Sequence, residues 1–131
     1  MKMRNFRTLL IWHKSMEIAT DVYCFAASLP TEEKFGIRSQ ITRAAVSMPS
    51  NIAEGCSRKS DKELAHFLEI ALGSSFELET QLLVCRNLAI GNRSIDDSIV
   101  TKLTTFQKML NVYYSKVTLN GSKSQQLTAK S

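Results

Sequence analysis

The chain has 131 residues, of which 44% are hydrophobic and 22% charged, and its formal net charge is +5. A chain of this length and composition folds as one domain around a single core, which excludes a globally disordered protein. No apolar run approaches the roughly 18 residues of a membrane-spanning helix, so no membrane partner is expected.

The start of the chain and its cysteines both indicate a cytoplasmic protein. The apolar run from Leu9 to Trp12 is too short for a signal peptide and leads into a charged amphipathic pattern. Cys24, Cys56 and Cys85 match neither a CxxC motif nor a Cys/His zinc spacing. An odd number of thiols is typical of reduced cysteines in a reducing compartment.

Two helical patterns occupy the first half of the chain, from about Thr8 to Leu29 and from about Ile37 to Cys56. Pro30 ends the first, and Pro49 is expected to kink the second. Apolar or small residues recur every three or four positions, which predicts one buried face on each helix. These residues are Leu9, Trp12, Met16, Ala19, Tyr23 and Ala26 in the first helix, and Ile41, Ala44, Ala45, Met48 and Ile52 in the second.

Two further helical patterns follow. Ser60 and Glu63 form a capping box at the start of the third helix, which Gly91 and Asn92 are expected to end. Its predicted core seam consists of Leu64, Leu68, Ala71, Ser75, Leu78, Leu82, Cys85 and Ala89. Ser94 and Asp97 stand in the same capping relation before the fourth helix, whose seam is Ile95, Ile99, Leu103, Phe106, Leu110 and Tyr113.

Four helices with short connections predict an all-α protein, an up-down-up-down antiparallel four-helix bundle. We expect this domain to span residues 1–119. The segment 120–131 has no apolar periodicity and is expected to be a disordered tail.

A polar stripe lies opposite the apolar side of the second helix. It consists of Arg43, Ser47, Ser50 and Glu54, and the two charges are too far apart to pair within one straight helix. Two serines between them would let another backbone approach closely, which favours a packing surface. An ordinary solvated face with a tolerated proline is the alternative.

The third helix carries a second apolar seam beside its core seam, formed by Ala65, Leu72, Phe76 and Leu83. A small chain whose helix is apolar on two faces usually covers something else, so we expect a homo-oligomer. An asymmetric bundle with both seams internal is the alternative. The expected interface residues are Ser47, Ser50, Glu54, Leu72, Phe76 and Leu83.

Three stretches, FRTLLIWHKSMEIATDVY, LPTEEKFGIRSQITRAAVSMPSNIAEGCSRKS and FLEIALGSSFELETQLLVCRNLAI, carry a family resemblance. The chain resembles the four-helix-bundle proteins encoded in intervening sequences of bacterial 23S ribosomal RNA genes, a family that includes the accessory variability determinant of diversity-generating retroelements. The resemblance spans about Phe6 to Ile90 and is most specific from Ser39 to Gly55. It implies a homo-pentameric ring with a basic surface for nucleic acid. For the retroelement member it also implies association with a reverse transcriptase.

The charge distribution also favours nucleic acid as a partner, because the basic residues gather in two segments. Residues 1–15 contain no acid, and residues 34–59 contain five cations and only Glu54 as an acid. A basic patch attracts phosphates without reading sequence. A charge that merely keeps the protein in solution is the alternative. The candidate nucleic-acid-binding residues are Arg4, Arg7, Lys14, Arg38, Arg43, Arg58, Lys59 and Lys62.

No catalytic or metal motif is evident, so we expect neither an enzyme nor a cofactor. A di-iron bundle needs two Glu-x-x-His motifs, and this chain has only Glu63 with His66, while His13 has no such motif. Two functions remain open. One is an accessory protein that binds RNA or an RNA/DNA hybrid without sequence specificity, and the other is a protein-interaction scaffold without nucleic acid, in which Arg43 and Glu54 pair across an interface.

Overall fold

The computed structural model describes residues 4–33 and 35–130, with side chains described as far as Gly121. Two short 3-10 helices, η1 (Phe6–Thr8) and η2 (Thr31–Glu33), flank the first long helix. The long helices are α1 (Leu10–Ala27), α2 (Ile37–Cys56), α3 (Asp61–Asn87) and α4 (Arg93–Lys130). No strand occurs in these described ranges, so the predicted all-α class is confirmed.

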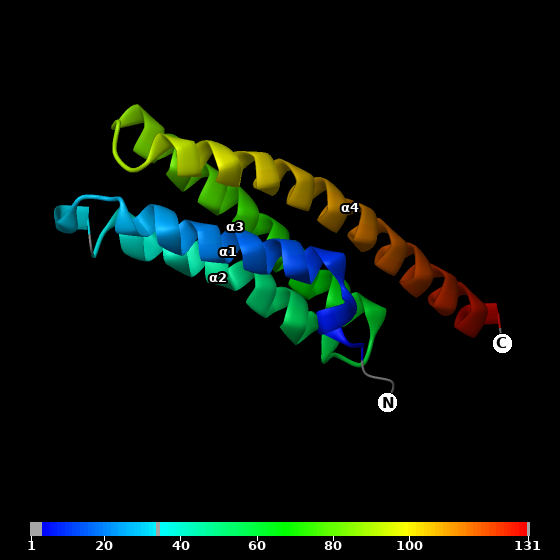
Figure 1. The fold of residues 1–131 in the computed structure, drawn as a ribbon. Helices are drawn as coiled ribbons and strands as arrows, with labels where there is room; N and C mark the ends of the chain where they lie inside the picture. The colour runs from blue at the N-terminus through cyan, green and yellow to red at the C-terminus, as the bar shows by residue number, and fades with distance from the viewer. Residues whose placement is uncertain (1–3, 34, 131) are drawn as a thin grey trace.

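The four long helices run lengthwise beside one another (Figure 1). Each packs against the next in the chain and α4 packs against α1, so the bundle closes as a square in the order of the chain. α1 packs against α2 and α4, and α3 packs against the same two helices, whereas the backbones of α1 and α3 are not neighbours within the described residues. Consecutive helices are antiparallel. The end of α2 at Gly55 faces the start of α3 at Leu64, whereas Ser47 is bonded to Ser74 further along. α1 and α3 therefore occupy diagonally opposite corners.

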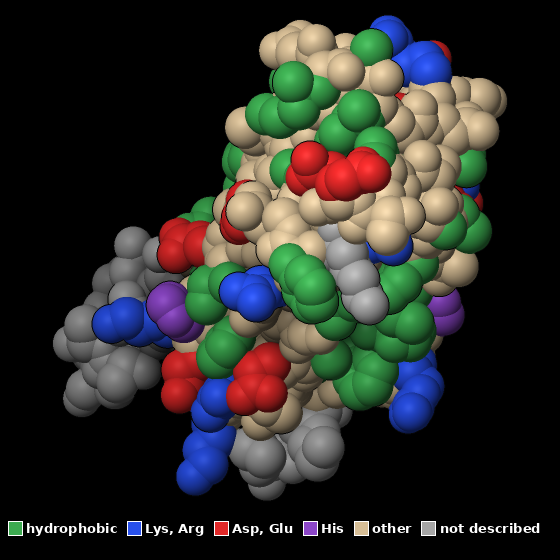
Figure 2. Space-filling model, turned by 90° about the vertical axis from the view of Figure 1, so that its left-hand side faces the viewer, with side chains coloured by type: hydrophobic (Ala, Val, Ile, Leu, Met, Phe, Trp, Pro, Cys, Tyr) green, Lys and Arg blue, Asp and Glu red, His purple; other side chains and the backbone are tan. Residues whose placement is uncertain are grey.

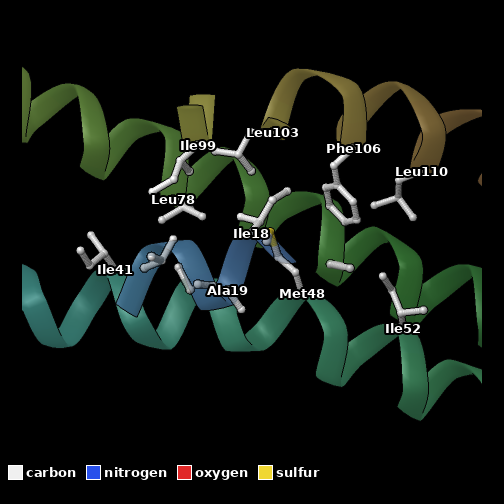
Figure 3. Packing of buried hydrophobic residues seen from close by; sticks show 14 of the residues in the cluster. Ile18, Ala19, Ile41, Met48, Ile52, Leu78, Ile99, Leu103, Phe106 and Leu110 are labelled. Carbon is white, nitrogen blue, oxygen red and sulfur yellow. The ribbon is translucent and has the colours of Figure 1, made fainter. Parts of the chain in front are cut away.

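The core lies along the axis of this square, where side chains from all four helices point toward one another (Figure 3). Ile18, Met48, Leu78 and Phe106 each contribute a fully buried side chain from a different helix. The apolar side predicted for α2 is buried completely, and so is the seam predicted for α3 except at Ala89, which is exposed. α2 continues through Pro49 without interruption, and Pro49 is itself buried.

The buried face of α1 differs from the predicted one. Ile11, Ile18, Val22 and Phe25 point into the core together with two alanines. Of the predicted seam, Met16 and Tyr23 are exposed, and Trp12 and Leu9 are half-buried. Both stripes have three- and four-residue spacing, and the stripe with the larger β-branched and aromatic share is the one that packs inside. Ala19 and Ala26 of the predicted seam are buried as expected, and Leu9 and Trp12 pack against the edge of the core, whereas Met16 and Tyr23 lie on the outer surface.

The turn between α3 and α4 is built from backbone caps. Ala89 and Gly91 have positive φ angles of 54° and 84°. The N–H of Ile90 donates to the carbonyl of Cys85 and that of Ala89 to the carbonyl of Arg86, which is the Schellman pattern with Ala89 in the left-handed position. α3 therefore ends at Asn87, four residues before Gly91, and Ala89 takes the left-handed position after the cap that the sequence assigned to the Gly91–Asn92 pair.

The start of α4 also differs from expectation. Asn92 caps it, because its side-chain oxygen accepts from the N–H of Ile95 at 3.1 Å. The predicted Ser94–Asp97 capping pair is wrong, since Asp97 instead accepts from Arg86 and Arg93, both at 3.0 Å. Two arginines are stronger partners for a carboxylate than one backbone amide.

α4 is drawn as a helix to Lys130 and extends past the other three helices (Figure 1). It therefore enters the segment 120–131. Residue 131 and the side chains beyond Gly121 lie outside the described part, and the disorder of this tail stays a prediction. Among the described residues, no helix combines the length and the hydropathy needed to cross a lipid bilayer.

Replacing Gly91 by alanine is expected to destabilise the fold. A Cβ atom there would lie 2.5 Å from two ring carbons of Phe25, and the residue has a positive φ. The strain and overpacking together should cost about 2 kcal/mol or more, a loss of roughly 5–10 °C in Tm. Thermal unfolding followed by circular dichroism measures it.

Gly73→Ala is the matched control, because Gly73 lies within α3 and a Cβ atom there meets nothing within 4 Å. It should stabilise the chain by about 0.5–1 kcal/mol through helix propensity. An equal Tm for the two variants would contradict the described turn.

Candidate nucleic-acid interface

The eight candidate cations do not form one patch, because the fold separates them along the bundle. Arg38 and Arg43 lie in the first two turns of α2, at the end where α1 finishes. The other six lie toward the opposite end, where η1, the start of α1 and the connection from α2 to α3 meet. Arg43 is about 20 Å along α2 from the carboxyl end of that helix. We call the second region the basic end.

Arg38 holds the fold together. Its guanidinium donates to the carbonyl of Leu29 at 2.8 Å, and its Nε atom is buried. The carbonyls just after a helix lack intrahelical partners, so this bond satisfies a group at the end of α1. The arginine is half-buried, and its guanidinium is directed at the backbone carbonyl of Leu29. It is therefore poorly placed to bind phosphate.

Arg4 ties the amino-terminal segment to the basic end. Its guanidinium forms an ion pair with Asp61, the first residue of α3, and donates to the carbonyl of Arg58 at 3.3 Å. Both side chains of the ion pair are more than two-thirds buried. This pair places η1 beside the connection between α2 and α3.

Arg58 is also engaged within the chain. It pairs with Glu54 one turn earlier and lies over the Phe67 ring, 4.8 Å from its centroid. The sequence suggested that Glu54 would be free for a partner outside its helix, but the carboxylate already has a cation. The pair is partly exposed, so it holds the arginine in place and leaves one edge toward solvent.

Three cations at the basic end have no acidic partner among the described residues: Arg7, Lys59 and Lys62. All three are exposed. Arg7 lies over the Phe6 ring, 5.1 Å from its centroid. Lys14, the remaining candidate, pairs with Glu17 at 3.7 Å. The contacts of Arg4 with Asp61 and Arg58 hold η1, which carries Arg7, at the same end of the bundle as Lys59 and Lys62.

The opposite end of the bundle has a mixed character. Figure 2 views this end and shows acidic and basic side chains side by side. Here Arg86 donates to the buried Asp96 at 2.8 Å and to Asp97 at 3.0 Å. The hydrogen bond to Asp96 raises the pKa of the Arg86 guanidinium. Arg86 and Arg93 are thus paired with carboxylates, and Arg38 is bonded to a backbone carbonyl, which leaves Arg43 as the one candidate cation of this end without a bonding partner among the described residues.

The predicted small-residue surface on α2 is used inside the chain at Ser47. The hydroxyl of Ser47 lies 2.8 Å from that of Ser74 on α3, and Asn51 donates to both the hydroxyl and the carbonyl of Ser47. At Gly55, about two turns beyond Ser47, a Cβ atom would lie 2.9 Å from both Leu64 and Phe67. Small residues therefore let α2 and α3 approach closely.

The other interface candidates lie on outer surfaces or beside the core. Ser50 is exposed and lines a groove of about 400 Å³ between α1 and α2, together with Trp12, Met16 and Tyr23. Leu72 is half-buried and packs against the core. Phe76 is 52% and Leu83 46% exposed, whereas Ala65 of the same seam is buried. The role of these residues between copies stays a prediction.

Two cations that sequence inspection missed are Lys108 and Lys116 on α4. Both are exposed, and both line a groove of about 430 Å³ between α4 and the start of α1, with Leu10 and Val112. The lysines of α4 are well separated in the sequence, so they do not stand out as a basic segment. Their positions away from the predicted core seam of the helix are the signal that could have identified them.

The described residues contain no group of three or more His, Cys, Asp or Glu side chains suited to a metal ion. Glu63 is part of the capping box of α3, as predicted. His66 lies edge-on to the Phe67 ring and lines a groove of about 730 Å³ between α3 and α4. Its lining mixes the carboxylates of Asp61, Glu63 and Glu69 with the cations of Arg58 and Lys62, so it has no single preferred charge.

Comparison with known proteins gives two positive findings. The family model described as 23S rRNA-intervening sequence protein matches residues 7–112. A crystal structure from Bacteroides thetaiotaomicron, described as a protein of unknown function from the S23 ribosomal protein family, superposes with a TM-score of 0.72. The two sequences are 29% identical, and the match covers 81% of this chain and 96% of the other. No curated protein matches the chain.

Substitution of Ser47 and of Ser50 by leucine should distinguish the serine that packs against α3 from the serine that lies on the outer surface. Ser47→Leu would force a larger side chain against Ser74 and should destabilise the fold by about 1–3 kcal/mol. Ser50→Leu, on an exposed position, should change stability by less than about 0.5 kcal/mol. Urea unfolding of the two variants measures both. Similar losses at the two positions would show that the close approach does not depend on Ser47.

Proposed function

Because the chain belongs to the family of 23S rRNA-intervening sequence proteins, we propose that it is a non-enzymatic, homo-oligomeric accessory protein that binds nucleic acid through its basic end. The proposed ligand is RNA or an RNA/DNA hybrid, contacted at its phosphates without sequence specificity. Association with a reverse transcriptase and a five-fold ring follow only from the family resemblance and belong to the same proposal.

The observation that carries the proposal is the group of unpaired cations at the basic end. Arg7, Lys59 and Lys62 are exposed and have no carboxylate partner among the described residues. Neighbouring Arg4 and Arg58 are paired with Asp61 and Glu54 and hold this segment in place. Such a cluster releases counterions when phosphates bind, which favours association at low salt.

The expected recognition is by charge and not by base edges. Lysines present point charges to phosphates, whereas base reading needs side chains that reach a groove in fixed geometry. Three unpaired cations on one copy give weak binding. Several copies in one assembly would repeat the cluster and bind a long phosphate backbone much more strongly through multivalency.

A protein-interaction scaffold is the second candidate function. It is favoured by the outer apolar grooves beside α1, one lined by Trp12, Met16 and Tyr23 and the other by Leu10 and Val112. Exposed apolar surface of this kind is typical of protein interfaces. The basic end and the grooves use different side chains, so the two candidate functions can be tested separately.

The basic end is tested with the variant Lys59→Gln/Lys62→Gln, which lowers the net charge by two. Its affinity for a structured RNA at low salt is expected to fall at least about tenfold. The slope of log affinity against log salt should decrease by about 2, because about one counterion is released for each phosphate contact. Fluorescence anisotropy over a salt series measures both quantities.

Arg43→Glu is the matched variant, since it also lowers the net charge by two at an exposed position. Its affinity for the RNA should change less than about threefold, because Arg43 lies about 20 Å along α2 from the basic end. Equal losses of RNA affinity in the two variants would show that binding does not depend specifically on the basic end. An absence of RNA binding by the unaltered chain at low salt would leave the scaffold as the better account.

A further inference from the structure

The groove between α1 and α4 is apolar at its centre and positive at its sides. Leu10 is 73% and Val112 57% exposed, and both line this groove. Exposing two branched aliphatic side chains to water is unfavourable in free energy, so covering them would be favourable. Lys108 and Lys116 line the same groove. An occupant of this groove has to be apolar in the middle and acidic on both sides.

The lysines of this groove are not neutralised by the chain's own acids. On α1, Glu17 and Asp21 are the carboxylates that face α4, and both are paired with Lys102 at 2.8 Å and 2.6 Å. The hydrogen bond from Lys102 lowers the pKa of Glu17, and the two carboxylates raise the pKa of Lys102. The described residues therefore leave Lys108 and Lys116 without an ion-pair partner.

The outer face of α3 has the complementary character. Phe76 and Leu83 are exposed, together with Ile70 and Val84. Glu69 and Glu77 are exposed beside them and form no ion pair within the described residues. Their hydrogen bonds come from neutral groups, from Tyr114 at 2.6 Å and from Gln81 at 3.3 Å, so no cation of the described residues is bonded to either carboxylate.

The spacing of the charges also matches. Glu69 and Glu77 are eight residues apart on α3, and Lys108 and Lys116 are eight residues apart on α4. Each pair therefore spans about 12 Å along a helix. Between the charges, α3 carries Phe76 and α4 carries Val112, so an apolar contact and two charge contacts can form together.

We propose that copies of this chain join head to tail, with the acidic apolar face of α3 in one copy docked into the basic apolar groove between α1 and α4 of the next. The inference rests on the homo-oligomeric part of the proposed function and assigns its surfaces. α1 and α3 lie at opposite corners of the bundle, so a copy does not cover its own groove. Two unlike surfaces give a heterologous contact, which forms a ring when the rotation between successive copies closes on itself.

A protein copy fits this groove better than nucleic acid does. A phosphate backbone would meet the two lysines but would leave Leu10 and Val112 in water. The α3 face satisfies both the charges and the apolar centre. Nucleic acid is left to the basic end, where Lys59 and Lys62 have no exposed aliphatic pair between them.

The test is a charge exchange on the full chain. Lys108→Glu/Lys116→Glu and Glu69→Lys/Glu77→Lys each place like charges across the contact and should convert the assembly to monomer. The fourfold variant that carries both exchanges restores opposite charges and should recover the mass of the unaltered chain. Light scattering in low salt without nucleic acid measures the mass, and circular dichroism checks that every variant is folded.

Three outcomes would overturn the inference: a monomeric unaltered chain, folded double variants that still assemble, or a fourfold variant that stays monomeric although both double variants dissociate. Lys59→Gln/Lys62→Gln is the control and should keep the assembled mass. Because this control concerns RNA binding alone, failure of the contact and failure of the nucleic-acid proposal give different results.

Discussion

Each helix of a four-helix bundle buries one side, yet α1 and α3 of this chain are apolar on two. The square arrangement places these two helices at opposite corners, where their second apolar sides face outward. The short connections and the close approach of α2 to α3 fix that arrangement. The grooves beside α1 and the exposed face of α3 follow from this one constraint, and so does the expectation that the chain associates.

The cations of the chain serve two different purposes. Arg38, Arg4 and Arg58 hold backbone carbonyls, carboxylates or an aromatic ring of the same chain, and they fix the positions of helix ends. Lys59 and Lys62 hold nothing within the described residues. Arginine suits the first purpose because its planar fork makes several directed bonds, whereas lysine acts as a mobile point charge. The proposed function therefore rests on the lysines and Arg7 more than on the arginines of the basic end.

Much of the fold could be predicted from the sequence because the main apolar seams of α2, α3 and α4, read from three- and four-residue spacing, are the ones that the bundle buries. The Ser60–Glu63 capping box could also be predicted, because it depends only on contacts between residues close in the sequence. α1 was different. Trp12, Met16 and Tyr23 have the same spacing as Ile11, Ile18 and Val22, and only packing against three other helices decides which stripe is buried. The predicted Ser94–Asp97 cap of α4 was wrong because the Asp97 carboxylate accepts hydrogen bonds from Arg86 and Arg93 instead. The candidate site was less predictable than the fold, since charge along a sequence does not show which charges are already paired.

The close approach of α2 to α3 at Gly55 links positions that are far apart in the chain. A methyl group there would meet Leu64 and Phe67 at 2.9 Å, so an alanine requires a smaller neighbour on α3 or a wider helix spacing. Across the family, substitutions at positions 55, 64 and 67 should therefore be inherited together, as an evolutionary coupling between the two helices.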